Sequence, residues 1–248
     1  MPALTTATTH DPRAPWRARR LPPALLAAWG ALWLLTAVAP ADRALWLLES
    51  ALPLSLVALL VGMYRAWHLS DASYLAIAAF LALHLAGAHW GYADVPLGRA
   101  LQDALAALGA RAGLAWGTRN PYDRVVHLAF GLCLVYPLRE LLRHHVRGPR
   151  AAALLALAVV VALGGAYEVL EWGAARVLAP GAASSFVGAQ GDPWDAQQDL
   201  ALAGVGAGAT LALVAAFGRR LREALAPRTA MRLAPGASFV ERRCAPTR

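Results

Sequence analysis

Residues 151–175 read AAALLALAVVVALGGAYEVLEWGAA, and this stretch decides the class of fold. Its first part, residues 151–166, contains no ionisable side chain. A helix needs about 20 mostly apolar residues to cross a hydrocarbon core of about 30 Å. Because a charged side chain at mid-membrane costs at least ~2.5 kcal/mol, a stretch with charges only toward one end predicts a membrane-spanning helix.

Five further stretches have the same character, and together they predict an all-α, polytopic membrane protein of about six transmembrane helices. Hydrophobic residues make up 58% of the 248-residue chain and charged residues only 15%, whereas soluble domains carry about 25% charged residues. The predicted spans are residues 21–40, 44–63, 72–92, 122–142, 151–175 and 196–218. We therefore expect one membrane domain over residues 21–218, with basic tails at 1–20 and 219–248.

The arginines predict which way the spans cross the membrane. Basic residues favour the cytoplasmic ends of membrane helices, and all 23 basic residues of this chain are arginines. They are concentrated in both tails and after the second and fourth spans. We therefore expect both termini in the cytoplasm and the connector at residues 93–121 outside.

The net charge of +8 also bears on partners. The arginines lie beside apolar spans and form no separate basic domain, which argues against a nucleic-acid partner. The expected partner is the lipid bilayer, with anionic headgroups at the cytoplasmic face. The sequence does not indicate an oligomeric state.

The connector at 93–121 contains a second kind of pattern. Leucines recur in it at helical spacing, and polar residues such as Arg99 and Asp103 lie on the other side. This pattern predicts a short helix lying in the membrane interface. The leucines are Leu97, Leu101, Leu105 and Leu108.

Ionisable residues form spaced pairs in the last three predicted spans, and residues three or four apart share one face of a helix. The fourth and sixth spans run inward and the fifth runs outward. The start of the fourth, the end of the fifth and the start of the sixth therefore lie at one depth, the extracytoplasmic boundary. The pairs are Asp123 with His127, Glu168 with Glu171, and Asp195 with Asp199. Glu49, His89 and Asp94 also fall toward outer ends of spans.

The composition of this cluster predicts a bound cation or trapped protons. With Asp192 it contains six carboxylates, and only Arg124 and Arg176 lie immediately beside them in sequence. Carboxylates crowded together in a low dielectric cannot all stay ionised without compensation. Carboxylates with one imidazole suit Mg, Mn, Zn or Fe, so a divalent metal ion is the expected cofactor.

The pattern assigns separate roles within the cluster, and simpler interpretations remain open. We expect Glu171, Asp195 and Asp199 to bind the metal, assisted by His127. Asp123, His127 and Glu168 are the candidate catalytic residues, as general base or as groups that orient a ligand. Alternatively, the carboxylates face headgroup water, or they hydrogen-bond between helices.

Glycines favour close packing of the fifth span against the sixth. Gly204 and Gly208 form a small-xxx-small pair, which lets two helices approach closely. Gly164 shares a helix face with Glu168 and Glu171, and Gly206 shares one with Asp195 and Asp199. Packing through these glycines would bring the acidic groups of the two spans together.

A longer motif carries a resemblance to a known family. The chain has NPYDR at 120–124, Tyr167-Glu168 with Glu171-Trp172, and the run FVGAQGDPWDAQQD at 186–199. These stretches resemble the YjdF-like family of bacterial inner-membrane proteins, whose function is uncharacterised. The resemblance implies a multi-pass protein of the bacterial inner (plasma) membrane. It adds six residues to the candidate site: Arg124, Trp172, Gln190, Asp192, Trp194 and Gln198.

The chain is more distantly similar to VanZ-like membrane proteins. Their pattern runs from an Asp/His pair that opens one span to an Asp that opens the last. That similarity implies a role in the cell envelope. This chain departs from the pattern, because Asp199 stands where those proteins usually have Asn and an extra glutamate is present.

Three functions follow as hypotheses. The first is a metal-dependent enzyme that acts on an envelope or lipid-linked substrate, the second a proton- or cation-coupled carrier, and the third a non-catalytic envelope or assembly factor. The inner halves of the fifth and sixth spans are nearly all Ala, Leu, Val and Gly, which argues against a carrier. The sequence has no GxSxG motif, so the reaction type of an enzyme, and its substrate, stay open.

Overall fold

The computed structural model describes residues 20–64, 67–113, 119–177 and 190–225, with side chains as far as 218. Of the predicted tails at 1–20 and 219–248, the structure describes residue 20 and residues 219–225, which continue the last helix. The chain divides into two compact units, Met1–Ala212 and Leu213–Arg248. The fold and site below belong to the first unit.

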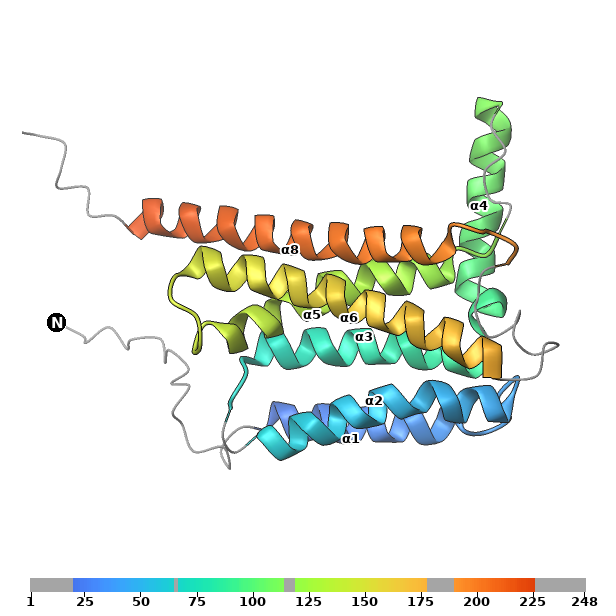
Figure 1. Cartoon of the computed structure of the whole chain (residues 1–248), viewed down its shortest axis with the longest axis horizontal. Helices are drawn as coiled ribbons and strands as arrows, with labels where there is room; N and C mark the ends of the chain where they lie inside the picture. The colour runs from blue at the N-terminus through green and yellow to red at the C-terminus, as the bar shows by residue number, and fades with distance from the viewer. Residues whose placement is uncertain (1–19, 65–66, 114–118, 178–189, 226–248) are drawn as a thin grey trace, which may run out of the picture. The chain divides into compact units, whose positions relative to one another are not determined.

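The described part of the chain contains helices and no strand, which confirms the all-α prediction (Figure 1). Five helices are long and apolar enough to cross a membrane, and α1 is a shorter apolar helix. The helices are α1 (Leu21–Thr36), α2 (Arg43–Met63), α3 (Asp71–Trp90), η2 (Tyr92–Asp94), α4 (Pro96–Ala112), α5 (Tyr122–Leu142), α6 (Pro149–Val177) and α8 (Asp195–Leu225). A multi-pass membrane protein of about six helices is therefore confirmed.

Local chemistry explains where several helices begin. Prolines stand in the first turn of α1, where a missing N–H leaves no hydrogen bond unmade. The Asp42 side chain caps α2 by accepting hydrogen bonds from the Ala44 and Leu45 N–H groups. Ser70 caps α3 in the same way through the Ser73 N–H.

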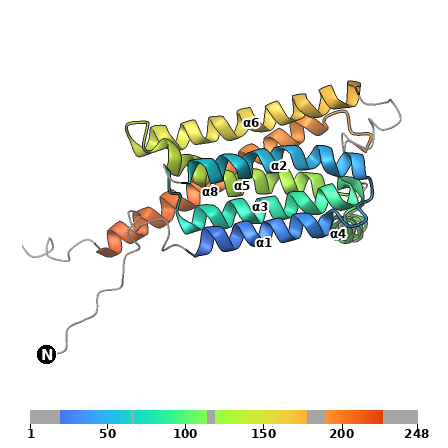
Figure 2. The same ribbon diagram turned by 90° about the horizontal axis from the view of Figure 1, so that it is seen from below.

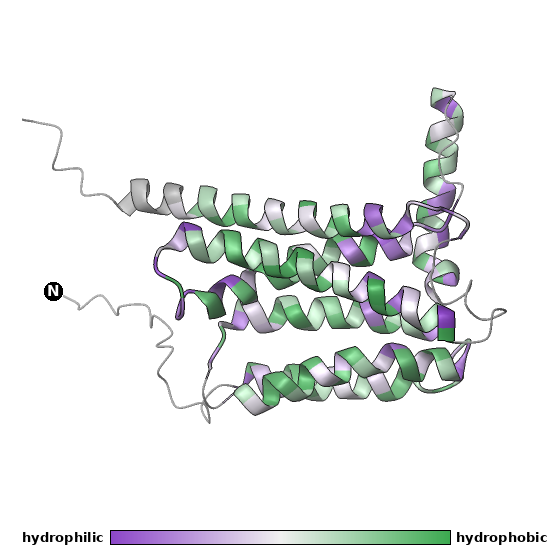
Figure 3. Cartoon of the chain, viewed as in Figure 1, coloured by the Kyte–Doolittle hydropathy of each residue, from purple (hydrophilic) through white to green (hydrophobic). Residues whose placement is uncertain are grey.

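Helix α3 is the centre of the packing. It packs against α1, α2 and α5, and α5 packs in turn against α6. Ile77, Leu81 and Leu85 of α3 belong to a buried apolar cluster that includes Trp29 of α1 and Leu134 of α5. Hydrophobic residues cover the middle of these helices, while hydrophilic ones gather near their ends (Figure 3).

The contact between α5 and α8 depends on glycine. A Cβ atom added at Gly131 would lie 1.9 Å from the carbonyl oxygen of Ala203, and one added at Gly206 would lie 2.3 Å from that of Leu128. The two backbones therefore touch directly, as small residues permit between membrane helices. This contact joins the fourth and sixth predicted spans, whereas the predicted Gly204 and Gly208 pair concerned the fifth and sixth.

The other glycine predictions have mixed outcomes. Gly164 of α6 does face α8, because an added Cβ would lie 3.3 Å from Leu200 Cδ1. Gly204 makes only an ordinary contact, 3.8 Å from Val161. An added Cβ at Gly208 would meet no described atom within 4 Å. On α8, therefore, Gly206 faces α5, Gly204 lies on the side of α6, and Gly208 meets neither helix among the described residues.

A polar contact ties α5 to the start of α3 at the opposite end of the helices from the acidic pairs. Glu140 Oε1 accepts a hydrogen bond of 2.8 Å from the Ser70 N–H. Its Oε2 accepts from the hydroxyls of Ser70 at 2.9 Å and Ser73 at 2.5 Å. Both carboxylate oxygens are therefore satisfied.

Helix α4 confirms the helix predicted in the 93–121 connector. It runs across the direction of the spanning helices in Figure 1, and it is seen nearly end-on in Figure 2. Its start is fixed by Asn120, whose Nδ2 donates hydrogen bonds to the carbonyls of Ala93 (3.0 Å) and Val95 (3.2 Å).

Candidate functional site

The acidic pairs lie where the start of α5, the end of α6 and the start of α8 meet. Side chains fix both helix starts. Asn120 Oδ1 accepts from the Tyr122 N–H at 3.0 Å before α5, and Asp192 Oδ1 accepts from the Trp194 N–H at 2.9 Å before α8. Asp123 and Asp195 then fall in first turns, where the helix dipole favours negative charge.

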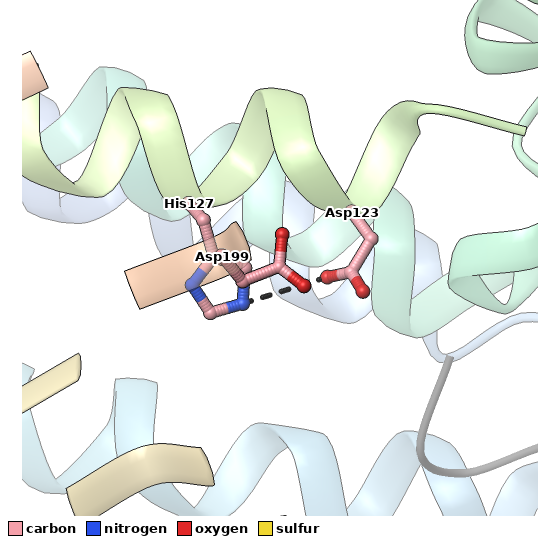
Figure 4. Close-up of side chains that lie close together, drawn as sticks. All are labelled: Asp123, His127 and Asp199. Carbon is pink, nitrogen blue, oxygen red and sulfur yellow. Dashed lines mark ion pairs between the residues drawn. The ribbon is translucent and has the colours of Figure 1, made fainter. Parts of the chain in front are cut away.

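Asp123, His127 and Asp199 form the tightest group of possible metal ligands in the described structure (Figure 4). Each offers one ligand atom, and these atoms lie within 4.8 Å of one another. His127 Nε2 is 3.6 Å from Asp123 Oδ1. All three residues are buried, and Asp199 is only 1% exposed.

Two carboxylate oxygens at this group have no hydrogen-bond donor among the described residues. They are Asp199 Oδ1 and Glu168 Oε1, and both are buried. Glu168 Oε1 lies 3.4 Å from His127 Nε2, so it belongs to the same group. Buried acceptors without a partner are rare in native proteins and cost about 1–3 kcal/mol, more when charged. Their presence favours a cation or protons at this place.

Two arginines lie on the loop side of the group. Arg124 Nη2 donates to Asp192 Oδ2 at 2.9 Å and to Asp195 Oδ1 at 3.1 Å. Arg119 also donates to Asp195 Oδ1. Arg124 Nη1 is 3.6 Å from Asp199 Oδ1. We call Arg119 and Arg124 the arginine pair.

The structure therefore divides the predicted cluster in two. Asp195 is held by the arginine pair, while Asp199 lies with Asp123 and His127. Glu171 is half-buried on α6 and is not part of the three-residue group. Metal binding by Glu171 and Asp195 stays a prediction, and the geometry now favours Asp123 in their place.

The motif residues of the 190–199 segment mainly support the loop. Gln190 Oε1 accepts from the Asn120 N–H and its Nε2 donates to the Asn120 carbonyl, both at 2.9 Å. Gln198 Nε2 donates to Asp192 Oδ2 at 3.0 Å. Trp172 and Trp194 are more than 60% exposed. Residues 186–189 of the motif lie outside the described residues.

The loop contacts set the charge of Asp192. The hydrogen bond from the Trp194 N–H, with the nearby Arg124 and Gln198 side chains, holds the pKa of Asp192 below its ordinary value. Asp192 therefore stays ionised and keeps its ion pair with Arg124.

A second buried polar group lies beside the first, and the sequence indicated only part of it. Tyr167 donates to Glu49 Oε2 at 3.3 Å. His84 Nε2 lies 2.9 Å from the Glu49 carbonyl, and Tyr92 Oη lies 2.7 Å from His84 Nδ1. Burial raises the pKa of Tyr92 well above its ordinary value. His84 and Arg119 gave no sequence signal, because neither belongs to a spaced acidic pair.

The other outer-end candidates lie elsewhere. His89 Nδ1 lies 2.9 Å from the carbonyl of Thr36. Asp94 forms an ion pair with Arg99 at the surface, where both side chains are 62% exposed.

A cavity of about 460 Å³ between α1, α2 and α3 is also separate from the site, because Pro22, Val61 and Tyr74 of its lining lie near the opposite ends of those helices.

Fold and site together define a multi-pass membrane protein with a buried carboxylate–histidine centre at one end of its helices. The chain belongs to the family described as "Predicted membrane protein (DUF2238)", whose model matches residues 21–220. It is 36% identical over 163 residues to the inner membrane protein YjdF of Escherichia coli (strain K12), which covers 65% of this chain and 73% of that protein. No solved structure matches the chain.

These matches confirm the YjdF-like resemblance and the location in the bacterial inner membrane. They do not bear on the similarity to VanZ-like proteins, which stays a prediction. The side of the membrane on which the centre lies also stays a prediction from the arginines.

Proposed function

We propose that this inner-membrane protein binds a divalent cation through Asp123, His127 and Asp199, and that the centre modifies an envelope or lipid-linked substrate at the extracytoplasmic boundary. The observation that carries the proposal is the buried Asp199 Oδ1, which has no hydrogen-bond donor among the described residues. It faces two other groups that ligate metals, within 4.8 Å. A bound cation would compensate all three.

The set of ligands fits a catalytic metal better than a structural one. Three protein ligands leave a coordination position open for water or substrate. One imidazole and two carboxylates suit Zn, Mn, Fe or Mg, whereas soft metals prefer thiolates. Such a metal would lower the pKa of a bound water and polarise a substrate oxygen.

The neighbouring residues would supply the remaining functions. Glu168 lies 3.4 Å from His127, so it is placed to accept a proton at the centre. The arginine pair is ion-paired with Asp192 and Asp195, so it would hold the loop beside the centre in place.

The alternative functions have less support. A carrier needs polar groups along its path, but the buried residues of α6 are Ala152, Ala156, Val160 and Gly164. A non-catalytic assembly factor would need no cation at the centre. Metal content therefore separates that hypothesis from ours.

The test is elemental analysis of the protein purified in detergent and dialysed against metal-free buffer, followed by titration with Zn²⁺, Mn²⁺ and Mg²⁺. We expect about one equivalent of metal in the wild type, and loss of binding in Asp199→Asn. Asp94→Asn is the matched control, because Asp94 is exposed and lies outside the centre. Absence of metal binding in a folded, monodisperse wild-type protein would refute the proposal.

A further inference from the structure

Helix α4 differs from the spanning helices in its direction. It runs across their direction, at the end where the centre is found (Figures 1 and 2). The spanning helices cross the bilayer, so a helix that runs across their direction lies along the membrane plane. At this end of the molecule that plane is the headgroup layer.

Three of the four leucines on the apolar face of α4 are exposed in the described structure. Leu97, Leu101 and Leu108 are 63%, 39% and 51% exposed, and their spacing places them on one face. The buried residues of this helix are Gly98 and Gly109. Thus α4 contacts the protein through Gly98, beside Asn120 and Tyr122, and presents three leucines outward, while Leu105 is half-buried.

The start of α4 is joined to the centre. A Cβ at Gly98 would lie 1.9 Å from Asn120 Oδ1, so the helix fits closely against Asn120. Asn120 directly follows Arg119 of the arginine pair, and its backbone is hydrogen-bonded to Gln190. The position of α4 is therefore coupled to the loop that carries Arg119.

Other exposed side chains indicate the same membrane depth. Trp90, Trp172 and Trp194 lie at the same ends of α3, α6 and α8 and are 43%, 62% and 64% exposed. Tryptophan is enriched at the membrane–water interface. Arg111 in the last turn of α4 is exposed as well, and it can reach lipid phosphates.

We propose that α4 is an interfacial helix that docks on the lipid headgroup layer of the leaflet beside the centre, the outer leaflet in the predicted orientation. Its leucines insert into the boundary between headgroups and acyl chains, about 5–10 Å deep for such helices. Arg99 and Asp103 face water. This proposal does not depend on a metal at the centre.

The test is a spin-label depth measurement in nanodiscs that contain only lipid and this protein. Cysteines are placed singly at Leu101 and Leu108, and as matched controls at Asp103 and Ala110, in a Cys133→Ala, Cys244→Ala background. We expect labels at the leucines to collide mainly with oxygen, and labels at the controls mainly with a water-soluble nickel complex.

Two results would overturn the proposal. If all four labels collide mainly with the nickel complex, α4 stands off the membrane. If the leucine labels are shielded but show dipolar broadening, a second copy of the protein covers the face instead of lipid. Oxygen-dominated collisions without broadening support docking on lipid, whatever the metal content of the same sample.

Discussion

The close contact of α5 and α8 allows a sharp test of how the centre is held together. In Gly206→Ala, the new Cβ would lie 2.3 Å from the carbonyl oxygen of Leu128 and 2.9 Å from the Leu132 nitrogen. Ordinary contacts begin at 3.4 Å, so the two helices must separate by about 1 Å. Both opposing atoms belong to the helix backbone, which cannot move aside as a side chain can.

The expected magnitude follows from two opposing effects. Overpacking of a well-packed contact costs about 1–3 kcal/mol, occasionally more, and clashes with backbone belong at the upper end. Replacing glycine by alanine inside a helix returns up to about 1 kcal/mol. We therefore expect Gly206→Ala to lose about 2 kcal/mol in the free energy of unfolding.

The same displacement should affect the centre, because α5 carries Asp123 and His127 while α8 carries Asp199. A misplacement of about 1 Å can reduce the activity of a site about 100-fold. We expect the affinity for the divalent cation to fall by at least about tenfold.

The control is Gly208→Ala, two residues along the same helix. A Cβ there meets no described atom within 4 Å, so we expect unchanged or slightly higher stability and unchanged cation affinity. Both variants are measured by reversible unfolding in detergent and by metal titration. Equal stability and equal affinity in the two variants would refute the proposed backbone contact.

Two further predictions concern polar contacts at opposite ends of α5. Arg124→Gln should destabilise the protein by about 2–3 kcal/mol in reversible unfolding. Removing one partner of a buried ion pair costs about 3–5 kcal/mol, and the loss is smaller here because the Arg124 side chain is 16% exposed. Arg99→Gln, at a pair that is 62% exposed, should cost no more than about 1 kcal/mol, and equal losses in the two variants would contradict the geometry. Glu140→Ala should lower the free energy of unfolding by about 1–3 kcal/mol, because it leaves the Ser70 and Ser73 donors without their acceptor. Glu140→Gln keeps a hydrogen-bond acceptor and should lose less. An equal loss in the two variants would show that the negative charge of Glu140 matters there, and not its role as an acceptor.

The sequence predicted the spans well, because hydropathy alone sets them. The predicted span 122–142 coincides with α5, and 44–63 differs from α2 by one residue. The first span was predicted to reach residue 40, but α1 ends at Thr36. There Thr36 Oγ1 accepts a hydrogen bond from Trp46 Nε1, and Asp42 starts the next helix. Side-chain contacts across a turn are not visible in hydropathy.

The sequence predicted at which end of the helices the site lies, but not which of its residues face one another. Helix direction was enough to bring the three acidic pairs to one end of the molecule. Which residue faces which depends on the rotation of each helix about its axis, and Gly131 and Gly206 fix that rotation by their contacts. Arg119 could not be assigned because it precedes α5 in a polar connector, where arginines are common for other reasons.

A comparison of Glu140 on α5 with Asp199 on α8 argues against a purely structural role for the centre. Glu140 shows what a structural carboxylate looks like in this protein, since three hydrogen bonds from Ser70 and Ser73 satisfy both of its oxygens. Asp199 is 1% exposed, yet its Oδ1 accepts no hydrogen bond from the described residues. The arginine pair donates hydrogen bonds to Asp192 and Asp195, and it lies at ion-pair distance from Asp199 (3.6 Å) and Asp123 (3.9 Å). Two guanidinium groups and one imidazole therefore face five carboxylates, Glu168 included. Such an excess of buried negative charge needs a cation or protons, whereas interhelical hydrogen bonding alone would have satisfied it as it satisfies Glu140.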